Sequence, residues 1–213
     1  DGLVCFLTDH IDKDIFDACP TLKIVSQYSV GFNNIDVEEA VRRGIAVTNT
    51  PGTSSRAVAE QAVALMLALT TRTVEGDLFM RAGSYTGWSP YLLNGTDLTG
   101  KIIGLLGGGA IGQEVASILY FGFNCPIIYS DIKNNPAFEE KFGATFVDKE
   151  TLLKNSDIVS LHVPLMPSTT HLINKDSLSL MKKDAYLINT SRGPVIDEVA
   201  LVAALKEGVI KGA

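Results

Sequence analysis

The chain has 213 residues, of which 46% are hydrophobic and 20% are charged. This balance is typical of a folded protein with a sizeable core, and it excludes disorder, collagen-like repeats and coiled coils. The formal charge of −6 disfavours binding to nucleic acid, which normally needs a basic face. No apolar run reaches the roughly 20 residues that span a bilayer, so we expect no membrane segment.

Short β-rich runs alternate with helical patterns along the whole chain. The predicted strands are 3–7, 22–28, 45–49, 101–106, 126–130, 144–147, 157–161 and 185–189. The predicted helices are 11–19, 36–43, 55–73, 110–121, 148–155, 174–181 and 197–207. This alternation, with little hairpin signal, predicts an α/β fold in which helices cover both faces of a parallel sheet.

The helix predicted at 55–73 is apolar on nearly every side. We therefore expect it to be buried on several faces, between domains or in a subunit contact. Residues 83–100 are rich in turn-forming residues and predict a surface loop. We place a domain boundary near residue 54, with a small α/β domain at 1–54 and a larger one at 55–213.

The cysteines and the two ends of the chain lead to two further expectations, one about the thiols and one about the extent of the chain. Cys5, Cys19 and Cys125 are widely spaced and form no CxxC pair, which indicates reduced, buried thiols and a cytoplasmic location. An apolar strand begins almost at residue 1, and 209–213 is typical of the opening of another strand. Because natural termini usually carry a few polar, loosely ordered residues, we expect an internal segment of a longer chain.

A glycine-rich turn follows the strand predicted at 101–106. Gly107, Gly109 and Gly112 satisfy the pattern G-x-G-x-x-G, in which the glycines allow a tight turn, a close approach to a pyrophosphate and close helix–strand packing. The next strand ends at Asp131, 19 residues after Gly112, where a carboxylate would bind the ribose hydroxyls. The sequence therefore predicts a dinucleotide site. The acidic side chain would repel a 2′-phosphate and favours NAD over NADP, although Lys133 lies nearby.

Arg192 lies just beyond the apolar strand predicted at 185–189. Ligands of open α/β sheets bind beyond the carboxyl ends of the strands. An arginine in this place can hold a carboxylate through two parallel hydrogen bonds. A structural salt bridge is the alternative interpretation of Arg192.

With these two motifs in place, the sequence resembles the D-isomer-specific 2-hydroxyacid dehydrogenases over essentially its whole length. The matching stretches are 28–36, 43–52, 58–60, 107–112, 162–174 and 188–193. The segment 86–95 looks most like the glyoxylate and hydroxypyruvate reductase (glycerate dehydrogenase) branch. The resemblance implies a Rossmann-type doubly wound parallel sheet in 55–213, incomplete at its C-terminal end. It also implies that 1–54 is part of a smaller, flavodoxin-like α/β substrate domain.

The resemblance further implies roles for single residues. The catalytic arginine of the family falls on Arg192, and the backbone amides that grip the substrate carboxylate fall on Val30 and Gly31. Trp88 either lines the substrate pocket or anchors a core. Besides Gly107 and Gly112 of the glycine motif, the contacts to NAD fall on Gly109, Ala110, Ile111, Asp131, Pro164, Thr169, Thr190 and Ser191.

The family's acid/base pair, a glutamate and a histidine, would lie beyond the end of this chain. His10, His162 and His171 fall elsewhere, so we expect them to be structural or solvated. No metal is expected. The resemblance also implies a homodimer, formed with the help of helix 55–73 and the segment 75–95.

The implied function is an NAD-dependent oxidoreductase that transfers a hydride between nicotinamide and a small D-2-hydroxy acid or 2-oxo acid. Without the acid/base pair, we expect the 213-residue chain to bind NAD(H) but to turn over slowly or not at all. Two alternatives stay open. One is a non-catalytic NAD-binding module of the corepressor or scaffold type, and the other is a phosphoglycerate dehydrogenase.

Overall fold

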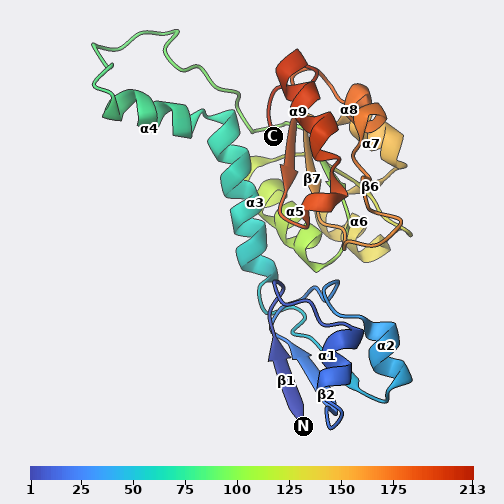
Figure 1. Cartoon of the computed structure of the whole chain (residues 1–213). Coiled ribbons are helices and arrows are strands. Elements are labelled where there is room, and N and C mark those ends of the chain that lie inside the picture. Colours follow the sequence, from blue (N-terminus) through green and yellow to red (C-terminus); the bar gives the residue numbers. More distant parts are fainter. The chain divides into compact units, whose positions relative to one another are not determined.

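The computed structural model describes all 213 residues, and they form two compact units, Asp1–Ser55 and Arg56–Ala213. Each unit is built around its own parallel sheet with helices packed against it (Figure 1). The strictly parallel pairing and the alternating element order confirm the α/β class that the sequence predicted.

The first unit contains a three-stranded sheet in the order β1-β2-β3. Its elements are β1 (Gly2–Cys5), α1 (Lys13–Ala18), β2 (Ile24–Gln27), α2 (Val37–Arg42) and β3 (Ala46–Thr48). Each helix begins after an aspartate whose carboxylate accepts a hydrogen bond from a first-turn amide, Asp12 for α1 and Asp36 for α2. Seven buried apolar side chains form the core: Cys5, Ile11, Phe16, Val25, Ile35, Ala40 and Ile45.

The second unit contains a five-stranded sheet in the order β6-β5-β4-β7-β8. The strands are β4 (Ile103–Leu106), β5 (Ile127–Ser130), β6 (Thr145–Phe146), β7 (Ile158–Leu161) and β8 (Tyr186–Asn189). The chain builds outward from β4 to β6, then crosses to the other side of β4 and continues through β7 to β8. This order confirms the Rossmann-type sheet, and the reversal makes the gap between the ends of β4 and β7 the topological switch point.

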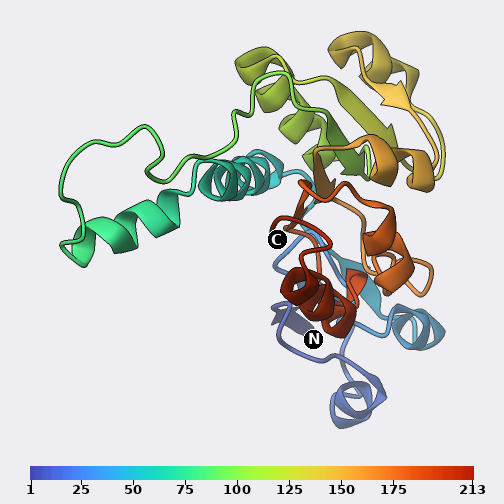
Figure 2. The same ribbon diagram turned by 90° about the horizontal axis from the view of Figure 1, so that it is seen from above.

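Helices cover both faces of this sheet (Figures 1 and 2). The covering helices are α3 (Ser55–Thr70), α5 (Ala110–Phe123), α6 (Pro136–Phe142), α7 (Lys149–Asn155), α8 (Lys175–Leu180) and α9 (Glu198–Glu207). Side chains alternate between the faces along each strand, so Ile158 packs with the α3, α5 and α6 residues, whereas Val159 packs with those of α7, α8 and α9. The sheet therefore has two separate apolar cores.

The helix predicted at 55–73 is shorter than expected, because α3 ends at Thr70 and a second helix, α4 (Thr73–Arg81), follows. Arg72 between them is left-handed, with φ of 57°, which breaks the helix. Within the second unit, α3 buries one face, whereas Ala64 and Leu65 are exposed. No residue of α4 is buried, and α4 and the loop after it project away from the sheet of this unit (Figures 1 and 2).

Helix α6, the cysteines and the loop after α4 differ in how well they match the expectations from the sequence. The helix α6 was not predicted, because only Phe138 and Phe142 of its seven residues are buried and so short a segment has no clear periodicity. Cys19 is exposed, which corrects the expectation that all three thiols are buried, whereas Cys5 and Cys125 are buried as expected. The surface loop predicted at 83–100 is fully exposed over residues 83–91, whereas Leu98 near its end is buried in the core of the second unit.

Candidate cofactor site

The last residues of four neighbouring strands form one row across the sheet of the second unit. Leu106 at the end of β4 pairs in register with Ser130 of β5 on one side and with Leu161 of β7 on the other. Leu161 in turn pairs with Asn189 of β8. The turns that follow these four residues therefore lie at the same edge of the sheet, where open α/β proteins bind their ligands.

The glycine turn after β4 is too crowded for side chains at two positions. Gly107 has φ of +104°, and a Cβ there would lie 2.6 Å from the carbonyl oxygen of His162. A Cβ on Gly112 would lie 2.2 Å from the carbonyl oxygen of Gly107. Real Cβ contacts are longer than 3.0 Å, so only glycine lets the end of β4, the first turn of α5 and the end of β7 come this close.

The second glycine of the motif has the opposite environment. Gly109 is the N-cap of α5, and a Cβ there would meet no atom within 4 Å. The N-terminus of α5 has no side-chain cap. The N–H groups of its first turn, beginning with Ala110 and Ile111, therefore donate to no capping side chain. Unpaired N–H groups and the helix dipole favour an anion at such a place. These residues fit the pyrophosphate of a dinucleotide.

Asp131 follows β5 and is bonded to the glycine turn. Its Oδ2 accepts a hydrogen bond of 2.8 Å from the Gly108 N–H, and its Oδ1 accepts one of 2.7 Å from the Ile132 N–H. These bonds fix the carboxylate beside the glycine turn, and the residue remains exposed. An ionised carboxylate has about four acceptor positions, so capacity remains for the hydroxyls of a ribose.

Two of the predicted cofactor contacts, Pro164 and Thr169, lie in the loop after β7. The Thr169 hydroxyl donates to the Pro164 carbonyl oxygen at 2.6 Å and accepts from the Met166 N–H at 2.8 Å. The threonine therefore closes a compact turn. The loop is also tied to the segment after β8, because the His171 N–H donates to the Pro194 carbonyl oxygen at 2.8 Å.

The turn after β8 carries the predicted Thr190, Ser191 and Arg192. Asn189 organises it: its Oδ1 accepts from the N–H and the hydroxyl of Ser191, and its Nδ2 donates to the Arg192 carbonyl oxygen at 2.9 Å. One guanidinium nitrogen of Arg192 donates to the Ser191 carbonyl oxygen at 2.8 Å. The Thr190 hydroxyl is buried without a hydrogen-bond partner.

The other predicted site residues lie outside this edge. Val30 and Gly31 belong to the first unit, in the turn that follows β2. Trp88 lies in the loop after α4, where 82% of it is exposed, and it belongs to neither apolar core of the second unit. Its predicted alternative role as a core anchor is therefore not seen in the second unit.

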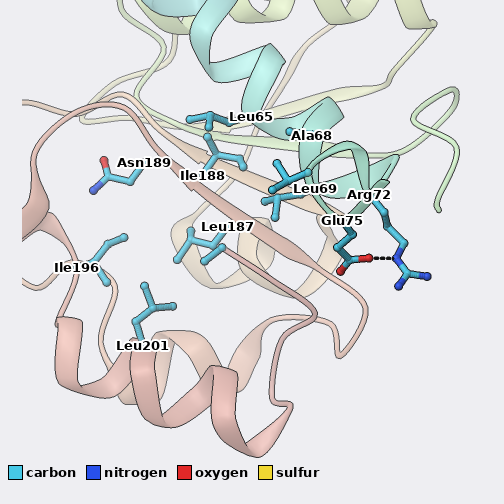
Figure 3. A pocket seen from close by; sticks show the side chains of 12 residues that line it. Leu65, Ala68, Leu69, Arg72, Glu75, Leu187, Ile188, Asn189, Ile196 and Leu201 are labelled. Atoms are coloured by element: carbon cyan, nitrogen blue, oxygen red, sulfur yellow. Dashed lines mark hydrogen bonds and ion pairs between the residues drawn. The ribbon is translucent and has the colours of Figure 1, made fainter. Parts of the chain in front are cut away.

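A cavity of about 370 Å³ in the second unit runs along β8 as far as Asn189, the last residue of that strand (Figure 3). Side chains of α3 and α4, such as Leu65 and Leu69, line it together with Leu187, Ile188 and Leu201. An ion pair between Arg72 and Glu75 lies at its margin. None of the glycine-turn residues nor Asp131 lines this cavity. We therefore assign the cofactor to the edge with the backbone donors and not to this apolar cavity.

His162 is the most perturbed titratable group at this edge. Both ring nitrogens are buried and have no hydrogen-bond partner. Burial disfavours the charged imidazolium and lowers the pKa of His162 from its ordinary 6.5 to about 4. This neutral ring supports the structural role expected of the residue, and it lies against the glycine turn, since its Cδ2 would be 3.9 Å from a Cβ on Gly112.

Two further observations concern metals and membranes. No group of three His, Cys, Asp or Glu side chains is arranged to hold a metal ion. No helix combines the length and the apolar character that crossing a membrane requires.

Comparison with known proteins identifies the class that this fold and site define. The model of the "D-isomer specific 2-hydroxyacid dehydrogenase, NAD binding domain" matches residues 63–213. The chain belongs to the D-isomer-specific 2-hydroxyacid dehydrogenase family, and it contains the family's NAD-binding domain.

Individual relatives extend the match to the whole chain. The chain is 51% identical to the glyoxylate reductase of Thermococcus litoralis and 53% identical to that of Thermofilum pendens, in each case over 100% of its own length. It spans only 65% and 63% of those relatives. The D-lactate dehydrogenase of Aquifex aeolicus, solved with NAD and lactic acid, superposes with a TM-score of 0.91 at 34% identity, over 99% of this chain and 62% of that one.

The pKa of His162 predicts an acid-dependent loss of stability. Between pH 6.5 and 4 the unfolded chain binds a proton at this residue that the folded chain does not, so the free energy of unfolding falls as the pH falls through this window. The loss is at most about 3 kcal/mol. The variant His162→Phe cannot titrate and should lose correspondingly less stability, measured by urea unfolding at pH 7 and pH 4.

The control for this experiment is His171→Phe, because His171 is exposed. It should keep the wild-type dependence on pH. Equal pH dependence in wild type and His162→Phe would contradict the assignment of a buried, neutral His162.

Proposed function

We propose that this chain carries the cofactor site and part of the substrate site of an NAD-dependent reductase that acts on small 2-oxo acids such as glyoxylate or hydroxypyruvate. The observation that carries the proposal is the register-aligned row of strand ends, which brings the glycine turn, Asp131 and the Arg192 turn to one edge. The names of the two relatives that are about half identical to the chain support the same reaction class.

In this proposal the pyrophosphate of NAD lies over Gly109 at the N-terminus of α5. Ala110 and Ile111 donate from the first turn, and Asp131 accepts from the adenine ribose. Pro164, Thr169, Thr190 and Ser191 line the remaining length of the cofactor. When bound, NADH supplies a hydride to the carbonyl carbon of the substrate.

The chain's own residues would hold the substrate. The N–H groups of Val30 and Gly31 bind its carboxylate, so residues 1–54 are part of a substrate domain and residues 55–213 form the NAD-binding domain. Arg192 binds the substrate as a cation and polarises its carbonyl oxygen, where negative charge develops during hydride transfer. Trp88 contributes an apolar wall to the substrate pocket.

Arg192 provides the most direct test of catalysis. Removal of one electrostatic donor to a developing oxyanion typically lowers kcat by about 10²–10³-fold, and we expect a loss of this size in kcat/KM for glyoxylate with Arg192→Ala. The affinity for NADH should change little. Turnover is measured from NADH absorbance in the full-length polypeptide that carries this sequence.

The matched control is Arg42→Ala, which removes an exposed arginine from α2 that pairs only with Glu39. It should keep wild-type turnover. A wild-type protein that binds NADH but reduces neither glyoxylate nor hydroxypyruvate would favour a non-catalytic NAD-binding module. Oxidation of 3-phosphoglycerate in preference to glycerate would favour a phosphoglycerate dehydrogenase.

The proposal includes a homodimer and a cytoplasmic location. On α4, Val74, Leu78 and Met80 are each 59–62% exposed, and Tyr91 in the following loop is 86% exposed. Apolar side chains gathered on one projecting segment are typical of an interface, and a second copy of the chain would cover them. The three cysteines are free, which supports a reducing compartment.

Negative charges introduced on α4 should dissociate the proposed dimer. Val74 and Leu78 are four residues apart and share one helix face, so the double variant Val74→Glu, Leu78→Glu would bury two carboxylates in the proposed interface. We expect sedimentation equilibrium to give a dimer for the wild type and a monomer for this variant. Val199→Glu, at an 81% exposed valine of α9, is the matched control and should stay dimeric. A monomeric wild type would contradict the proposal.

A further inference from the structure

In the turn after β2 in the first unit, three successive carbonyl groups accept hydrogen bonds and two N–H groups donate none. The Ser29 carbonyl oxygen accepts from the Thr50 N–H at 3.0 Å, and the Val30 carbonyl oxygen accepts from Asn49 Nδ2 at 2.8 Å. The Gly31 carbonyl oxygen accepts from the Ser29 hydroxyl at 2.6 Å. Within this unit, neither the Val30 N–H nor the Gly31 N–H donates a hydrogen bond.

These carbonyl bonds set the direction of the unused N–H groups. Every peptide bond of the chain is trans, so the C=O of one residue and the N–H of the next point in opposite directions within one plane. The bond from Thr50 to the Ser29 oxygen therefore directs the Val30 N–H. In the same way, the bond from Asn49 to the Val30 oxygen directs the Gly31 N–H.

A buried relay of side chains holds the same turn from the opposite side. Asn34 Nδ2 donates to the carbonyl oxygens of Phe6 at 2.9 Å and Asp9 at 2.8 Å, and Gln27 Oε1, at 3.2 Å, shares one of its two hydrogens. With its Oε1 so occupied, Gln27 donates through Nε2 to the Ser29 hydroxyl at 2.8 Å. Ser29 then donates to Gly31, so the relay ends on the turn itself.

Stability alone does not account for this relay. Gln27 is 1% exposed and Asn34 is 8% exposed, and the Asn34 Oδ1 is buried without a hydrogen-bond partner. An unpaired buried acceptor is unfavourable, and of the bonds that Gln27 donates, the one to Ser29 contributes to the turn and not to the packing of the core. The polar residues are explained by the geometry that they impose on the turn.

We propose that Asn49 and the Gln27–Ser29 relay are positioning elements that aim the Val30 and Gly31 N–H groups at the carboxylate of the substrate. This inference rests on the proposed function, in which these two N–H groups bind that carboxylate. Neither Asn49 nor Gln27 touches the substrate. Each acts on the direction of an N–H group through the carbonyl oxygens of the turn.

The test compares steady-state kinetics of variants in the full-length polypeptide with NADH and glyoxylate. Asn49→Ala should raise the KM for glyoxylate about tenfold, the effect of one misdirected hydrogen bond, and change kcat by less than about threefold. Gln27→Met, which fills the same space without donating to Ser29, should raise the KM by about three- to tenfold. Competitive inhibition by oxalate should weaken in parallel, and the affinity for NADH should not change.

The matched control is Thr48→Val, next to Asn49 in the chain. It removes a hydrogen bond of 3.0 Å between the Thr48 and Ser26 hydroxyls in the same sheet and leaves the turn untouched. Its KM should equal that of the wild type. A merely structural role of Asn49 would lower the stability of Asn49→Ala and leave its KM equal to that of Thr48→Val.

The outcomes separate the inference from the proposed function. A wild type without activity on any 2-oxo acid overturns the proposed function and this inference together. An active wild type whose KM for glyoxylate is unchanged in both Asn49→Ala and Gln27→Met overturns the inference alone. A folded Asn49→Ala that loses NADH affinity and kcat in the same proportion also overturns it.

Discussion

The second unit depends on one steric constraint, which is the absence of side chains at Gly107 and Gly112. With these two glycines, the end of β4, the first turn of α5 and the end of β7 approach within distances that any Cβ would prevent. This close approach lies at the topological switch point of the sheet, and it places the glycine turn beside Asp131. The cofactor proposal depends on this tight turn, because the turn places the uncapped N–H groups of α5 close to the Asp131 carboxylate.

The two units fix their polar turns by the same device. In the second unit the Asn189 side chain bonds to both ends of the turn that carries Arg192. In the first unit the Asn49 side chain bonds to the carbonyl of the turn that carries Val30 and Gly31. An amide side chain donates and accepts at once, so a single residue can hold a turn that has no regular secondary structure. Each turn is thereby held by hydrogen bonds from within its own unit.

Much of the fold could be predicted from the sequence, because apolar strands and capped helices alternate regularly. The glycine turn and the role of Asp131 could also be predicted from the sequence, since a short motif and a fixed spacing define them. The break at Arg72 could not be predicted, because neither glycine nor proline marks this left-handed residue. The helix α6 has a start signal in Asn135 and Pro136, a capping residue followed by proline, but it is too short to show a helical period.

The polar relay in the first unit could not be predicted from the sequence. Asn34 and Phe6 are 28 residues apart in the chain and become hydrogen-bond partners only when the unit has folded. Asn49 reaches Val30 across a separation of 19 residues. Such contacts depend on strand pairing, which a single sequence does not specify residue by residue.

The preference between NADH and NADPH tests the central claim most directly. Binding of each cofactor is measured by fluorescence titration of the wild type and of Asp131→Asn, which keeps an acceptor for the Gly108 N–H but removes the charge. We expect the wild type to bind NADH more tightly than NADPH by at least about tenfold, and Asp131→Asn to narrow this difference by strengthening NADPH binding. A wild type that binds neither cofactor, or an Asp131→Asn variant with an unchanged preference, would contradict the site.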